Sequence, residues 1–166
     1  MEARAKVLGH PIHQMLIVLP LGLLSTAVIF DLIHLVTHGA TWSLVSYWMI
    51  AAGVIGGLLA ALFGVIDWTK IPSGTRAYRL GILHGLGNVC VVLFFAISWF
   101  LRRSDPADPS AAAIVFLLIG GGLSLVTGWL GGELVDRLGV GVDDGAHLDA
   151  PSSLSGPVEP SAARHR

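Results

Sequence analysis

Charged residues are scarce in this sequence: Asp, Glu, Lys and Arg together make up 13% of its 166 positions. Soluble domains carry about 25%, because their surfaces face water. The net charge is −1, and the sequence has no cluster of Lys and Arg like those that neutralise nucleic-acid phosphates. The composition therefore argues against a nucleic-acid partner, and we predict none. The 54% of hydrophobic residues makes the lipid bilayer the expected partner.

Cysteine is almost absent as well. Cys90 is the only one, so no disulfide can form within the chain, and its place inside an apolar stretch predicts a small residue of the core. The sequence also lacks a phosphate-binding loop, a Cys-x2-Cys pair, a His-Glu-x2-His motif and a Gly-x-Ser-x-Gly elbow. No nucleophile–base pair can be placed, so we predict no catalytic residue and do not favour an enzyme.

What the sequence does contain is four long apolar stretches, at about residues 12–36, 44–66, 80–101 and 111–134. Each is longer than the roughly 20 residues with which a helix crosses a hydrocarbon core of about 30 Å. We therefore predict an all-α integral membrane protein, a four-helix bundle of two transmembrane hairpins over residues 1–142. The polar remainder, residues 143–166, is rich in Pro, Ser and Ala and is predicted to be a disordered cytoplasmic tail.

Basic residues in the predicted loops indicate the orientation. Six lie on the side that carries both termini and two on the other, namely Arg4, Lys6, Lys70, Arg76, Arg79 and Arg137 against Arg102 and Arg103. Because loops rich in Lys and Arg stay in the cytoplasm, we predict that both termini are cytoplasmic.

Small residues form one face on each of two predicted helices. On the second helix they are Gly53, Gly56, Gly57, Ala60 and Gly64, and on the fourth they are Gly120, Ser124, Thr127, Gly128 and Gly131. Such faces let helix backbones approach closely in lipid. We expect both of them to be packing surfaces.

Polar side chains gather at the predicted cytoplasmic end of all four helices, namely His10, His13, Asp67, His84, Asn88 and Glu133. His84 and Asn88 share one face of the third helix, whereas helical geometry sets Glu133 opposite the small-residue face of the fourth. Ionisable groups inside a membrane usually pair, bind a ligand or do chemistry. One interpretation is structural: His13, His84 and Asp67 form a hydrogen-bonded clamp that holds the hairpins together.

The other interpretation is a cofactor site. Two imidazoles on two inward-facing helices are what an axially ligated haem b requires, here His13 and His84, and Arg76 and Arg79 would meet its propionates. Alternatively, a divalent metal would take the mixed nitrogen and oxygen ligands that suit zinc or iron. The candidate ligands are His10, His13, Asp67, His84 and Glu133.

A second polar stripe lies at the other end of the first helix. Asp31, His34 and His38 are spaced i, i+3 and i+7, which places them on one face. This spacing suits an external metal or proton-entry site. The alternative, which we favour, is a buried acid that pairs helices, with two histidines at the interface.

Several motifs together resemble a known family. They are Gly-His-Pro-Ile-His at 9–13, Asp31, Asp67-Trp68, His84 with Asn88, Gly-Trp-Leu-Gly-Gly-Glu-Leu-Val at 128–135 and Gly-Val-Gly-Val at 139–142. This set resembles the bacterial membrane proteins catalogued as domain of unknown function 2231, over about residues 8–142. Gln14 and Asp136 depart from the family pattern, which often has Pro and Tyr there.

The resemblance implies a four-helix, multi-pass domain of the bacterial inner membrane, which in some relatives is joined to a Rieske-type iron–sulfur domain. That association favours redox or electron-transfer work. This chain lacks the Cys and His pairs of such a cluster, so an iron–sulfur partner would be a separate protein. Three hypotheses therefore stand: a redox subunit that binds haem or a metal, a proton-coupled carrier with a path from Asp67 and His84 to Asp31, and a structural or assembly subunit.

Overall fold

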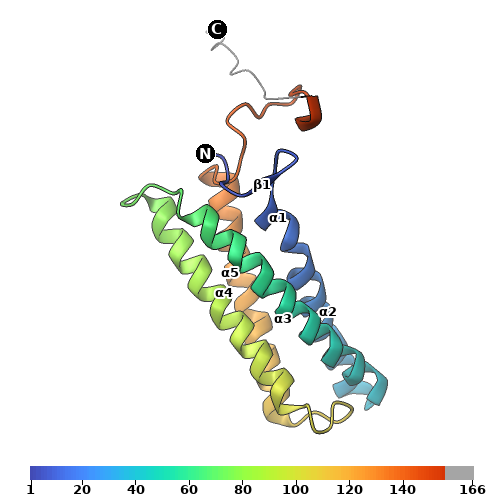
Figure 1. Cartoon of the computed structure of the whole chain (residues 1–166). Coiled ribbons are helices and arrows are strands. Elements are labelled where there is room, and N and C mark those ends of the chain that lie inside the picture. Colours follow the sequence, from blue (N-terminus) through green and yellow to red (C-terminus); the bar gives the residue numbers. More distant parts are fainter. Residues whose placement is uncertain (156–166) are drawn as a thin grey trace.

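The computed structural model describes residues 1–155, and its main body is a bundle of long helices (Figure 1). The helices are α1 (Ile12–Leu16), α2 (Val18–Thr37), α3 (Ala40–Trp68), α4 (Arg76–Leu101) and α5 (Ala111–Gly132), which continues into the π-helix η1 (Glu133–Arg137). Two short strands, β1 (Lys6–Val7) and β2 (His10–Pro11), precede them, and a 3-10 turn, η2 (Ser153–Ser155), follows. The predicted all-α fold is confirmed.

Four spans in the described part are long and apolar enough to cross a membrane: Ile12–Thr37, Ala40–Trp68, Arg76–Leu101 and Ala111–Arg137. They match the four predicted stretches to within a few residues. The first span is divided between α1 and α2 at Ile17. Pro20 explains the division, because it has no N–H to donate to the carbonyl of Leu16 one turn earlier.

The ends of the helices follow the local sequence. Thr75 begins α4 by accepting the N–H of Tyr78, and Ser110 begins α5 by accepting the N–H of Ala113, as hydroxyl residues do at helix N-termini. His38 ends α2 in the left-handed conformation, with a φ of 54°. The turn that it starts leads directly into α3.

The helices pack as two hairpins, α2 with α3 and α4 with α5, which meet mainly where α3 contacts α4 and α2 contacts α5 (Figure 1). Glycines allow the close approach within each hairpin: a Cβ on Gly53 would lie 2.5 Å from Leu24, and one on Gly120 would lie 3.0 Å from Phe95. The core between the hairpins is apolar and consists of Leu24, Ala27, Ile50, Val91, Phe95 and Leu117.

The small-residue faces are only partly as predicted. Gly53, Gly56, Gly57 and Gly64 all abut side chains of other helices, as do Gly120 and Gly131. In contrast, no side chain of residues 1–155 lies within 4 Å of the position of a Cβ on Gly128. Gly128 therefore lies on the outer side of α5. It sits at the margin of the predicted face, where a small rotation of the helix turns it outward.

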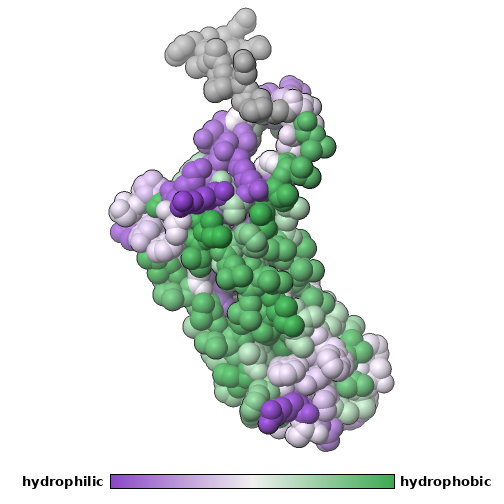
Figure 2. Space-filling view, viewed as in Figure 1, coloured by the Kyte–Doolittle hydropathy of each residue, from purple (hydrophilic) through white to green (hydrophobic). Residues whose placement is uncertain are grey.

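The middle of the surface is apolar and both ends are polar (Figure 2). Large side chains such as Leu21, Leu58 and Leu125 are 61%, 55% and 77% exposed, as a wall that faces lipid requires. Cys90 is exposed on this wall, so the prediction that it belongs to the core is wrong. An apolar stretch of a membrane helix faces lipid as readily as protein, so its composition does not indicate burial.

The N-terminal segment closes over the end of the bundle at which Met1 meets the residues that follow η1, here called the terminal end (Figure 1). Strands β1 and β2 pair antiparallel, and the turn between them has positive φ at Leu8 and Gly9. The Met1 ammonium donates to the Gly139 carbonyl at 3.0 Å, and the Gly141 N–H donates to the Met1 carbonyl at 2.9 Å. Of the predicted tail, residues 143–155 form turns and η2, whereas residues 156–166 lie outside the described residues.

Candidate functional site

Two histidines on different hairpins lie close together at the terminal end. His13, on α1, has Nδ1 2.8 Å from the Ala60 carbonyl of α3, and His84, on α4, has Nδ1 2.9 Å from the Thr127 carbonyl of α5. A ring nitrogen that faces a carbonyl must carry the hydrogen. Each neutral imidazole therefore donates from Nδ1 and keeps the lone pair of Nε2 for another partner.

The two imidazole rings are held beside each other by glycines. Their centroids are 6.4 Å apart and their planes are nearly perpendicular, at 88°. A Cβ on Gly64 would lie 2.9 Å from Cε1 of His13, and one on Gly131 would lie 3.1 Å from Cε1 of His84. Because neither glycine has a side chain, each leaves space that an imidazole ring occupies.

Asn88 and Thr127 extend the polar contacts of His84. The Asn88 amide donates to the His84 carbonyl at 2.8 Å, and its nitrogen also lies 3.2 Å from Nε2 of the His84 ring. The Thr127 hydroxyl donates to Oδ1 of Asn88 at 3.2 Å. His84 and Asn88 therefore both face α5, and the prediction that they share one face of the helix is confirmed.

The other predicted ligands have different partners. Asp67 accepts the backbone N–H groups of Arg4 and Ala5 with Oδ1, at 2.7 and 2.8 Å, and His10 contacts Ser153. Within residues 1–155, no group of three or more His, Cys, Asp or Glu side chains is placed to hold one metal ion. The structure thus brings together His13 and His84 and leaves the other three predicted ligands apart.

The predicted clamp of His13, His84 and Asp67 is not formed as such, because the N-terminal segment folds back onto the carboxylate of Asp67. Glu133 also differs from the prediction. It forms an ion pair with Arg76 of α4, N to O 2.6 Å, and its side chain is 17% exposed. Both side chains are long enough to reach across, and the backbone from Glu133 is a π-helix, which changes the helical geometry used for the prediction.

Of the two arginines predicted to meet propionates, Arg76 is half exposed and bound to Glu133, and Arg79 is exposed one turn further along α4. Both lie on the first turns of α4, at the same end as the two histidines. Neither arginine forms a hydrogen bond with either imidazole.

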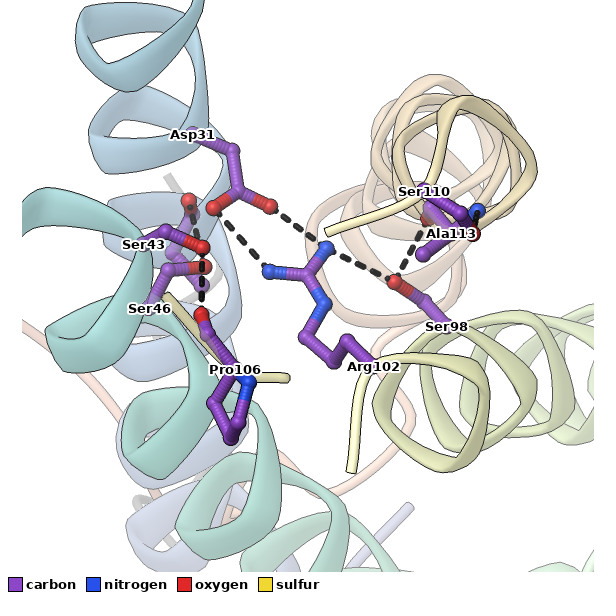
Figure 3. Close-up of polar contacts among 9 residues, drawn as sticks. Asp31, Ser43, Ser46, Ser98, Arg102, Pro106, Ser110 and Ala113 are labelled. Atoms are coloured by element: carbon purple, nitrogen blue, oxygen red, sulfur yellow. Dashed lines mark hydrogen bonds and ion pairs between the residues drawn. The ribbon is translucent and has the colours of Figure 1, made fainter. Parts of the chain in front are cut away.

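A second polar site lies at the opposite end of the bundle (Figure 3). Asp31 of α2 and Arg102, which ends α4, form two parallel hydrogen bonds of 3.1 and 2.7 Å, and their side chains are 1% and 0% exposed. Ser98 accepts from Arg102 at 3.0 Å and donates to the Ala113 carbonyl of α5 at 2.6 Å. This fully buried ion pair joins the two hairpins.

Sequence reasoning missed the role of Arg102, because it treated the residue as a loop charge. The available signal was the lone acid Asp31 at a similar depth, together with Ser98 four residues before Arg102 on the same helix face. The interpretation of Asp31 as a buried acid that pairs helices is confirmed. His34 binds the Gly39 carbonyl and His38 ends α2, so the three residues form no common ligand set.

Four long apolar helices, joined as two hairpins with polar contacts buried at both ends, define a multi-pass integral membrane protein. The chain belongs to the family described as predicted membrane protein (DUF2231), whose sequence model matches residues 9–144. The family that the motifs resemble is thus confirmed. No curated protein and no solved structure is detectably similar to the chain.

Proposed function

We propose that this protein is a redox-associated membrane subunit that binds haem b, or otherwise a single transition-metal ion, through His13 and His84. The observation that carries the proposal is the fixed tautomer of both rings: each Nδ1 donates to a main-chain carbonyl. This is the arrangement that orients metal-binding histidines and raises their basicity. It leaves two Nε2 lone pairs from two hairpins, with the ring centroids 6.4 Å apart.

The number of donors favours haem over a bare ion. Haem brings four nitrogens of its own and needs at most two axial ligands from the protein, whereas a bound zinc usually takes three or four protein ligands. Asp67 and Glu133 are already bound elsewhere. The Asn88 amide would give up its contact with Nε2 of His84 and keep its hydrogen bond to the His84 carbonyl. A bound haem would supply one-electron transfer, and Arg76 and Arg79, on the first turns of α4, would be the cations for its propionates.

The location that fits this proposal is the bacterial inner membrane with both termini in the cytoplasm, and the electron partner would be a separate iron–sulfur protein. Burial of Arg102 strengthens the orientation argument, because a paired internal charge does not act as a free loop charge. Of the two basic residues counted at the opposite end, only Arg103 then remains, compared with the six counted at the terminal end. A membrane-impermeant maleimide should label Asp108→Cys in intact cells and Ser73→Cys only after lysis, and the reverse pattern would refute this orientation.

The second candidate is a structural or assembly subunit. It is supported by the same hydrogen bonds, since His13 ties α1 to α3 and His84 ties α4 to α5. In contrast, the carrier hypothesis has little support. The apolar core that includes Leu24, Phe95 and Leu117 lies between the two polar sites, and a proton path would need polar groups there.

The deciding experiment is a visible absorption spectrum, oxidised and reduced, with metal analysis of the same detergent-purified protein, produced with haem available. The proposal predicts a Soret band and sharp reduced peaks that disappear in His13→Ala and His84→Ala and persist in His147→Ala, which changes an exposed histidine. A featureless spectrum without stoichiometric metal would refute it. The assembly alternative then predicts only a lower unfolding temperature for His84→Ala.

A further inference from the structure

A groove of about 270 Å³ lies on the outer side of α5 and η1, at the terminal end, and is lined by Trp129, Gly132, Glu133, Asp136 and Arg137. Gly132 opens it: apart from its own helix backbone and chain neighbours, the one atom of residues 1–155 within 4.0 Å of the position of its Cβ is Oδ2 of Asp136. The groove is separate from His13 and His84, which do not line it. Its occupant would therefore contact neither of the two proposed ligands of haem or metal.

The charges in this groove are of both signs, and two of them are free. Glu133 is bound to Arg76 at 2.6 Å. Asp136 and Arg137 are both exposed, and neither forms a salt bridge with any side chain in residues 1–155. Although they are neighbours in the chain, they do not pair with each other. One carboxylate and one guanidinium thus line the same groove, each without an ion-pair partner in the part of the chain that the structure describes.

The other side of the groove continues into the apolar wall. Leu125, Trp129 and Gly132 are spaced at i, i+4 and i+7 on one face of α5, and Leu125 and Trp129 are 77% and 63% exposed. Trp at this height is typical of the boundary between hydrocarbon and headgroups. A molecule that fills the groove therefore has a charged part beside Asp136 and Arg137 and an apolar part along Trp129 and Leu125.

We propose that this groove binds a phospholipid with a zwitterionic, primary-amine headgroup of the phosphatidylethanolamine class. The ammonium donates to the Asp136 carboxylate, the phosphate accepts from Arg137, and one acyl chain lies along Trp129 and Leu125. Charge-assisted hydrogen bonds of this kind are the strong ones. A trimethylammonium headgroup has the same charge but no N–H to donate, so the site distinguishes the two headgroups by hydrogen bonding.

The test is native mass spectrometry of the full chain in detergent with phosphatidylethanolamine, phosphatidylcholine and phosphatidylglycerol of identical acyl chains. We expect about fivefold more bound phosphatidylethanolamine than phosphatidylcholine, the effect of one partly exposed charge-assisted hydrogen bond. Asp136→Asn should remove this preference and Asp136→Glu should keep it. Asp105→Asn, which changes an exposed acid at the opposite end, should not alter it.

Two further measurements separate the lipid from other occupants. Gly132→Leu fills the groove and should lower retention of the lipid about as much as Asp136→Asn does. Water-soluble glycerophosphoethanolamine should not compete at equal concentration, because it lacks the acyl chains that contact Trp129. Equal binding of all three lipids, stronger binding of phosphatidylglycerol, an unchanged preference in Asp136→Asn, or full competition by the soluble headgroup would each overturn the proposal.

Discussion

At the scale of single residues, the buried pair of Asp31 and Arg102 is the most demanding contact in the molecule. Removing two charges from water costs several kcal/mol for each ion, and only good geometry with further hydrogen bonds offsets that cost. The pair has both, in its two parallel hydrogen bonds and the bond from Arg102 to Ser98. Nε of Arg102 nevertheless has no partner within residues 1–155. The hydrogen bonds of the pair therefore offset the cost of burying the two charges by only a small margin.

Replacing one residue of this pair should destabilise the protein far more than replacing both. Asp31→Leu or Arg102→Met alone leaves one buried charge without a partner and should lower the free energy of unfolding by about 3–5 kcal/mol. The double variant should recover most of that loss. Arg103→Met is the matched control: Arg103 is exposed and its guanidinium lies over the ring of Phe100, so its loss should cost about 0.5–1 kcal/mol. Unfolding in mixed micelles, followed by circular dichroism, measures all four. Equal losses of unfolding free energy in Arg102→Met and Arg103→Met would contradict the assignment of Arg102 and Asp31 as a buried ion pair.

At the scale of helices, the contacts of each hairpin depend on which glycines face a neighbouring helix. Gly120 faces the fully buried ring of Phe95. Gly122, two residues further on, has no atom of another helix within residues 1–155 less than 4 Å from its Cβ position. Two residues on a helix are about 200° apart. One glycine therefore serves packing and the other contacts lipid.

Alanine at these two positions should change the stability of the protein in opposite directions. In Gly120→Ala the Cβ would lie 3.0 Å from Phe95, whose buried ring cannot move aside, so overpacking should cost about 1–3 kcal/mol. Gly122→Ala should stabilise α5 by about 0.5–1 kcal/mol, because alanine is less flexible in the unfolded chain. Thermal unfolding of the two variants in the same detergent shows whether each substitution raises or lowers the stability. If both stabilise the protein equally, the packing described for Gly120 is refuted.

At the scale of the whole molecule, the two hairpins are fastened together at both ends. Asp31 and Arg102 join them at one end, and at the terminal end the N-terminal segment bridges Asp67, which lies at the end of α3, and residues 139–144, which follow η1. Between these ends the two hairpins contact each other through the apolar core. Lys6 and Asp143 contribute an exposed ion pair of 3.6 Å to the terminal contact.

The terminal contact should depend on pH. The backbone N–H of Gly145 and the charge of Lys6 lower the pKa of Asp143 below 3.8, and hydrogen bonding to Glu2 raises the pKa of Lys6 above 10.5. A lowered acid pKa gives stability that is present above 3.8 and lost as the pH falls through the lower folded value. A raised lysine pKa gives stability that is present below 10.5 and lost as the pH rises through the higher folded value.

We therefore expect the N-terminal segment to stay attached between these limits and to loosen first in acid. The protection factor of the Gly141 amide, which donates to Met1, measures attachment after correction for the intrinsic exchange rate. Asp143→Asn should remove the acid dependence, whereas Asp149→Asn, at an exposed acid in the same segment, should retain it. An acid dependence that survives in Asp143→Asn would show that another group is responsible.

Much of the architecture could be predicted because one rule dominates in lipid: a long apolar stretch must be a helix. The approximate helix limits, the two hairpins and the shared face of His84 and Asn88 follow from length and spacing. The errors have a common cause. Cys90 and Gly128 were assigned to packed faces, yet apolar composition is the same toward lipid and toward protein. The partner of Asp67 is the backbone of a segment whose fold no spacing rule describes.

The sequence by itself determined the class of protein, the family and the two ends at which polar groups gather, because hydrophobic length and local motifs do not depend on distant contacts. Only the tertiary structure decided which polar groups meet. It placed His13 beside His84, separated them from Asp67 and Glu133, and buried Arg102 against Asp31. The physical reason is that each partner comes from a different helix, so the rotation and depth of whole helices, set by glycine contacts, fix which side chains can touch.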